Sequence, residues 1–184
     1  MQTIYLKEFI KTGNFGEIIV GVSTRDDLIR LLEKNFDFAD CGESCIIKYG
    51  WYEFFYWSDT KKIFGIQNDH VCADCVNHKE MISFQNRLWK LDTWFLKELS
   101  HVTFAQIMNY LRQENIAFEV ITFSKYSDEQ GIRCVDSCVT FDFVDEYCTV
   151  ERTKRKKVKT VKELKVTHQD DFVLNGIRLW EHES

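Results

Sequence analysis

The stretch from residue 45 to residue 68, CIIKYGWYEFFYWSDTKKIFGIQN, constrains the fold of this chain more than any other segment. It predicts three short strands, because blocks rich in β-branched and aromatic residues are separated by Gly50 and by the polar turn SDTKK. In the middle block, WYEFFYW, aromatic residues occupy both alternating sets of positions, so both faces of that strand carry rings. We therefore expect an antiparallel meander whose middle strand is covered on both faces.

Two predicted helices share a pattern at their start. Ser23 is the expected N-cap of the first, with Asp26 as the capping-box acid, and Thr103 with Gln106 takes the same roles in the second. A valine precedes each N-cap residue and strands follow each helix, which is typical of two related halves. The alternative is that a valine followed by Ser or Thr is only a common way to begin a helix. The sequence predicts an α+β fold with helices packed on an antiparallel β-sheet.

Length and composition favour one cooperative core. The chain has 184 residues, of which 45% are hydrophobic and 15% aromatic, which is ample for one domain and short for two. We expect a single α+β core domain over residues 1–150 and a basic C-terminal extension over residues 151–184, packed on that core. Within the extension, Asn175-Gly176 lies between apolar residues and predicts the turn of a C-terminal β-hairpin.

Several classes of protein are disfavoured by what the sequence lacks. It has no run of about 18 apolar residues, and its first residues, MQTIYLKEFIKTG, carry charges where a signal peptide needs an apolar stretch. Seven cysteines are an odd number and are too sparse for a disulfide framework, so we expect reduced thiols. No G-x-S-x-G, H-E-x-x-H, P-loop or G-x-G-x-x-G motif occurs. We expect a cytoplasmic protein that is not an enzyme and needs no cofactor.

One short segment, DHVCADCVNH, contains residue types that bind metals. Its candidate zinc ligands are His70, Cys72, Cys75 and His78. They could complete a site locally, or the Cys72 and Cys75 pair could be joined by Cys41 and Cys45. Because no second C-x-x-C pair exists, the interpretation we favour is a loop between strands with reduced cysteines and no bound metal. Thiol–disulfide chemistry is disfavoured too, since the pair precedes a predicted strand instead of opening a helix.

Charge is distributed unevenly along the chain. Residues 1–150, which we call the acidic body, hold 15 basic and 23 acidic residues, a net charge of −8. The basic run, residues 152–165, holds eight basic residues and one acidic residue. Such a run could bind nucleic-acid phosphates, but it contains no aromatic residue to stack on a base and it is attached to an acidic body. A solvated hairpin or a partner for the acidic body is the favoured interpretation, and we do not expect nucleic-acid binding.

Two segments, LKEFIKTGNFGEIIVGVSTRDDLIRLL and IIKYGWYEFFYW, resemble a group of small bacterial proteins found among the immunity proteins of polymorphic toxin systems. Many members of that group are uncharacterised. The matching residues are Gly13, Gly16, Gly21, Lys48, Tyr49, Gly50, Glu53 and Phe54. The resemblance covers about residues 4–145, while the basic run and the Cys/His segment depart from it.

The resemblance implies a non-enzymatic immunity protein, or antitoxin, that binds and neutralises a cognate toxin. An acidic body would suit capture of a basic toxin domain, because electrostatic complementarity speeds and orients association. The alternative, from a different class, is an intracellular binding protein that is stabilised by zinc or associated with nucleic acid. The sequence does not indicate the oligomeric state or the surface that a partner would contact.

Overall fold

The computed structural model describes residues 1–69, 71, 82–83, 85–97, 102–123, 130–144, 147–154, 157–164 and 168–181. The described helices are α1 (Leu6–Thr12), α2 (Arg25–Leu32) and α4 (Phe104–Gln113), with the 3₁₀ turns η1 (Trp94–Lys97) and η2 (Gln169–Asp171). The first seven strands are β1 (Gln2–Tyr5), β2 (Asn14–Phe15), β3 (Ile18–Ile19), β4 (Asp37–Asp40), β5 (Ser44–Tyr49), β6 (Tyr52–Trp57) and β7 (Ile63–Asn68). The others are β8 (Trp89–Asp92), β9 (Phe118–Thr122), β10 (Gln130–Cys134), β11 (Thr140–Val144), β12 (Tyr147–Lys154), β13 (Lys157–Leu164) and β14 (Val173–Trp180).

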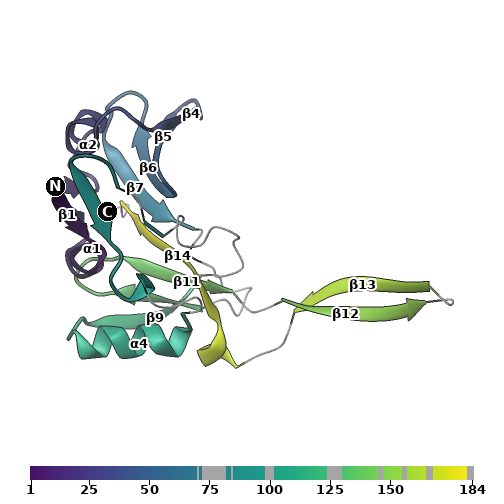
Figure 1. The fold of residues 1–184 in the computed structure, drawn as a ribbon. Coiled ribbons are helices and arrows are strands. Elements are labelled where there is room, and N and C mark those ends of the chain that lie inside the picture. The colour runs from purple at the N-terminus through teal and green to yellow at the C-terminus, as the bar shows by residue number, and fades with distance from the viewer. Residues whose placement is uncertain are drawn as a thin grey trace.

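Eight strands form one antiparallel sheet in the order β4-β5-β6-β7-β14-β11-β10-β9, so the last strand of the chain lies at its centre (Figure 1). The three described helices lie together on one side of this sheet, and β1 pairs in parallel with β8 on the same side. β5, β6 and β7 are consecutive antiparallel neighbours, as the meander predicts. The predicted α+β fold with helices on an antiparallel sheet is confirmed.

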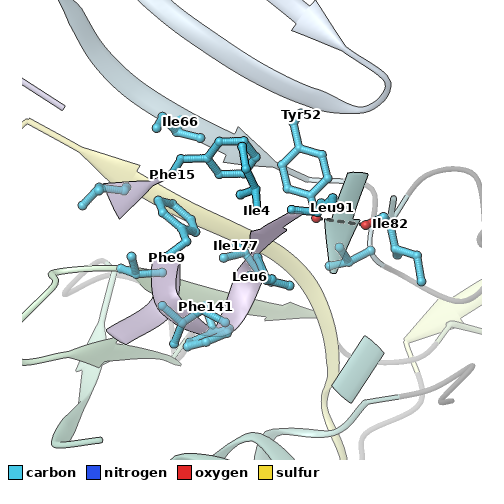
Figure 2. Close-up of a cluster of buried hydrophobic side chains, with 14 of the residues drawn as sticks. Ile4, Leu6, Phe9, Phe15, Tyr52, Ile66, Ile82, Leu91, Phe141 and Ile177 are labelled. Carbon is cyan, nitrogen blue, oxygen red and sulfur yellow. Dashed lines mark hydrogen bonds between the residues drawn. The ribbon is translucent and has the colours of Figure 1, made fainter. Parts of the chain in front are cut away.

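The hydrophobic core fills the space between the helices and the inner face of the sheet (Figure 2). Phe9 of α1 meets Phe15 in an edge-to-face contact with ring centroids 5.6 Å apart, and Phe15 meets Phe54 of β6 at 5.3 Å. Each of these rings is at most 1% exposed. The hydroxyl of Tyr52 donates a hydrogen bond of 3.0 Å to the carbonyl oxygen of Ile82, so the buried phenol keeps a partner.

Both capping boxes exist, but the first lies one residue later than predicted. Thr24, not Ser23, caps α2: its hydroxyl accepts a hydrogen bond from the N–H of Asp27, whose carboxylate accepts one from the N–H of Thr24. The Ser23 hydroxyl instead accepts a hydrogen bond of 2.9 Å from the N–H of Ile19. For α4 the prediction is confirmed, with Thr103 as N-cap and Gln106 as its partner.

The hairpin turn predicted at Asn175-Gly176 is wrong, because both residues lie inside the continuous strand β14. Glycine is needed there for close approach: a Cβ on Gly176 would collide with the carboxylate of Asp142 on the neighbouring strand. A hairpin does exist near the start of the extension expected over residues 151–184, but β12 and β13 form it, and β12 already begins at Tyr147. β14 then returns the chain to the centre of the core sheet, between β7 and β11.

The sheet consists of two halves with matching connections. The first contains α2 and β4 to β7, and the second contains α4, β9 to β11 and β14. In the first, the N-cap Thr24 forms an isolated bridge to Lys62, just before β7; in the second, the N-cap Thr103 forms one to Val173, at the start of β14. β7 and β14 pair antiparallel where the halves meet, as two units related by an approximate two-fold axis would.

An irregularity in strand pairing recurs at the same place in both halves. The register between β6 and β7 shifts after Phe55, which lies opposite Gly65. The register between β11 and β14 shifts after Asp142, which lies opposite Gly176. Together with the matching bridges, this shared bulge supports the two related helix-plus-strands halves that the sequence suggests.

Candidate binding face

The face of the sheet opposite the described helices, which we call the open face, keeps large side chains in contact with solvent. The inner residues of β6 are buried, whereas Trp57 on its outer side is 40% exposed and Trp180 on β14 is 36% exposed. The expectation that the middle strand of the meander is covered on both faces is therefore wrong. The described helices lie on only one side of the sheet, so the other face of this strand stays in contact with solvent (Figure 1).

Four rings form what we call the aromatic patch on the open face: Phe55, Trp57, Phe64 and Trp180. The ring centroids of Trp57 and Phe64 are stacked 4.2 Å apart. Trp180 lies 4.8 Å from Phe55 and 6.1 Å from Phe64, between centroids. The Trp180 ring can lie against the sheet only because Gly65 is beneath it, where a Cβ would collide with the ring. Pairing of β6, β7 and β14 thus assembles the patch from distant parts of the chain.

A groove of about 500 Å³ lies next to the aromatic patch, over the second half of the sheet. Its lining includes Trp180 and Phe123, which is 47% exposed. Asp142 accepts hydrogen bonds from Asn175 Nδ2 at 2.7 Å and from Arg178 Nε and Nη2 at 2.9 and 3.1 Å. Because Arg178 balances the charge of Asp142, this polar part of the groove has no net charge.

The polar residues over the first half of the open face are paired as well. Glu53 accepts a hydrogen bond of 2.8 Å from Gln67 Nε2 and one of 3.4 Å from Lys48 Nζ. The same Lys48 ammonium lies 4.2 Å from the ring centroid of Trp51, a cation–π distance. The open face therefore combines satisfied polar pairs with exposed aromatic rings, and aromatic rings are enriched at the energetic centre of protein–protein interfaces.

Sequence reasoning locates Phe55, Trp57 and Phe64 in the meander but misses their contacts with Trp180 on β14. A signal for them is present in the sequence. Residues 63–66 read IFGI and residues 174–177 read LNGI, and these segments occupy equivalent positions on β7 and β14. The glycine of each segment leaves room for a side chain from a neighbouring strand, Trp180 over Gly65 and Asp142 over Gly176.

The proposed zinc ligands His70, Cys72, Cys75 and His78 lie outside the described residues. Of the two cysteines considered as additional ligands, Cys41 is exposed and Cys45 is buried, and both are free thiols. In the part of the chain that the structure describes, no group of three or more His, Cys, Asp or Glu side chains is arranged to hold a metal ion.

Two further cysteines lie close together in sequence at the end of β10. Both Cys134 and Cys138 are free thiols, and Cys134 is only 1% exposed. Burial raises the pKa of the Cys134 thiol to about 12, so it is protonated at neutral pH. A buried, protonated thiol is a structural group and not a nucleophile.

Comparison with known protein families, curated proteins and solved structures finds no match to this chain. Among the described helices, none has the length and apolar character needed to cross a membrane.

Proposed function

We propose that this chain is a non-enzymatic bacterial immunity protein that binds and neutralises a cognate toxin through its open face. The observation that carries the proposal is the aromatic patch, in which Trp57 and Trp180 keep 40% and 36% of their surface exposed. Contiguous exposed apolar surface is characteristic of interaction sites, and tryptophan is enriched among the residues that dominate binding energy. The resemblance of residues 4–145 to immunity-type proteins supports the same function.

The charge of the acidic body indicates the chemistry of the partner. Residues 1–150 carry a net charge of −8, which favours encounter with a basic domain. A toxin domain that acts on nucleic acid is basic for that purpose, so its surface would complement this one. Neutralisation requires only a rigid complementary surface, and the satisfied polar pairs on the open face provide one at low reorganisation cost.

The proposal is tested by capture of the partner and by protection from it. The tagged chain is expressed with its neighbouring genes and recovered at moderate salt, and a captured protein is identified by mass spectrometry. We expect one basic protein in stoichiometric amount, whose expression alone stops growth and whose toxicity this chain suppresses. Capture of no such protein, or a captured protein whose toxicity persists in the presence of this chain, would contradict the proposal.

A paired set of variants connects that activity to the open face. The variant Trp57→Ala/Trp180→Ala removes the two exposed rings of the aromatic patch and should lose protection. The control Tyr5→Ala/Leu88→Ala removes two apolar side chains that are 52% and 50% exposed and lie outside the patch, and it should protect like the wild type. Thermal unfolding of all three proteins shows whether each variant is folded. Protection by a folded patch variant would exclude the aromatic patch as the binding site.

A further inference from the structure

The hairpin of β12 and β13, residues 147–164, which we call the arm, is an addition to the second half of the sheet. In the first half, five residues, 58–62, connect β6 to β7. In the second half, the equivalent strands β11 and β14 are connected by residues 145–172, which include the arm. The arm projects from the sheet (Figure 1). Because the first half closes without such a segment, the sheet does not need the arm for its own connectivity.

The basic residues are concentrated in the distal half of the arm. From residue 152 to residue 159 the sequence reads RTKRKKVK, six basic residues and no acidic one. Strand register places Arg152 opposite Lys159 and Lys154 opposite Lys157. Successive positions of a strand alternate between faces, so these four positions share one face of the ribbon. Like charges at directly opposite positions destabilise a hairpin, and an isolated hairpin is marginal by itself.

The arm separates this cationic end from the acidic body. Each strand of the arm has eight residues, which at about 3.3 Å per residue gives a length of roughly 25 Å. At physiological ionic strength, screening reduces electrostatic interactions over a Debye length of about 8 Å. The end of the arm is therefore about three such lengths from its base, and the net charge of the body has little influence there. The expectation against nucleic-acid binding relied on that net charge and on the absence of an aromatic residue, and the second ground concerns stacking on single strands and not contact with a duplex.

We propose that the described ends of β12 and β13, at the positions of Arg152, Lys154, Lys157 and Lys159, bind the phosphate backbone of duplex DNA. A two-stranded antiparallel ribbon fits the major groove of B-form DNA, whereas the major groove of an RNA duplex is too narrow to be read in this way. Basic residues at these four positions would neutralise phosphates and release their counterions. Single-stranded nucleic acid is disfavoured because the distal half contains no aromatic residue on which a base could stack.

The experiment compares two variants that remove the same number of charges. One changes Arg152, Lys154, Lys157 and Lys159 to Gln; the control changes four exposed lysines of the body, Lys11, Lys34, Lys62 and Lys90, to Gln. Binding to a fluorescently labelled, mixed-sequence DNA duplex is measured by anisotropy over a range of salt concentrations. Each phosphate contact contributes about 0.9 to the slope of log K against log salt, so the arm variant should reduce that slope by about three to four. The control should keep the wild-type slope.

A second variant guards against an effect of misfolding. It replaces residues 147–164 with a short Gly/Ser linker, which the shorter connection of the first half indicates the sheet can accommodate. This variant should keep the thermal transition of the sheet and lose DNA binding. The proposal would be overturned if the wild type did not bind DNA at low salt. It would also be overturned if the four-lysine control lost as much of the slope as the arm variant.

Two further measurements separate this proposal from its alternatives. Sedimentation measures whether the chain associates with itself. Self-association that depends on the arm, without DNA binding, would mean that the arm contacts the acidic body of a second copy, and it would overturn the proposal. Tighter binding to an RNA duplex than to a DNA duplex would also overturn it. DNA binding is independent of the proposed immunity function, so the arm variant should still protect cells from the toxin.

Discussion

At the scale of single residues, glycines determine where large side chains can lie on the open face. The ring of Trp180 lies over Gly65, and the carboxylate of Asp142 lies over Gly176. In each half of the sheet, the glycine is paired with the residue after which the strand register shifts, Phe55 for Gly65 and Asp142 for Gly176. Both glycines lie between strand residues in the sequence, but the sequence predicts a turn at Gly176, where the structure has a close approach of two strands. Only the identity of the neighbouring strand distinguishes a turn from a close approach.

Gly65→Ala should therefore destabilise the protein, because its new Cβ collides with the Trp180 ring and the ring must move. Overpacking of this kind costs about 1–3 kcal/mol of unfolding free energy, measured by urea denaturation. In a Trp180→Ala background the ring is absent, so Gly65→Ala should lower the unfolding free energy much less. An equal cost in both backgrounds would show that the ring does not lie over Gly65 as described.

At the scale of elements, the two capping boxes differ in one chemical respect. The box of α2 uses the carboxylate of Asp27, while the box of α4 uses the amide of Gln106, which does not titrate. The sequence predicts both helices, yet the cap of α2 is one residue later than expected, and the Ser23 hydroxyl instead accepts a hydrogen bond from the N–H of Ile19. A hydrogen bond from a residue four positions earlier is not part of the capping-box pattern, so that pattern alone does not place the cap.

The capping difference predicts how acid affects stability. The hydrogen bond from the Thr24 N–H, followed by that from its hydroxyl, lowers the pKa of Asp27 below its usual value of 3.8. A lowered pKa means that the stabilisation is present above the unfolded-state pKa and is lost as pH falls through the folded-state value. Unfolding free energies measured by urea at decreasing pH should fall less steeply for Asp27→Asn than for the wild type.

Asp26→Asn is the matched control for that series, since Asp26 is in the same helical turn but outside the capping box. It should follow the wild-type pH dependence more closely than Asp27→Asn does. Identical curves for the wild type and Asp27→Asn would mean that the carboxylate of Asp27 contributes no acid-sensitive stability. Thr24→Ala should remove the cap at every pH, at a cost of about 1 kcal/mol.

At the scale of the whole molecule, the sequence predicts the fold class and the two halves, but not the order of the strands. Repeated helix caps and alternating strands are local patterns, and both halves contain them. The central pairing of β7 with β14 joins residues 63–68 to residues 173–180, across the Cys/His segment and the arm. That pairing also creates the aromatic patch, so the candidate site is a consequence of long-range topology and was only partly predictable.

The central claim is that the aromatic patch is where the toxin binds, and calorimetric titration of purified partner into this chain tests it most directly. Trp57→Ala/Trp180→Ala and the control Tyr5→Ala/Leu88→Ala are titrated in parallel. Loss of a single dominant aromatic anchor costs about 2 kcal/mol or more, so Kd for the patch variant should rise at least about 30-fold. The control should keep the wild-type Kd. A folded patch variant that binds as tightly as the wild type would contradict the account.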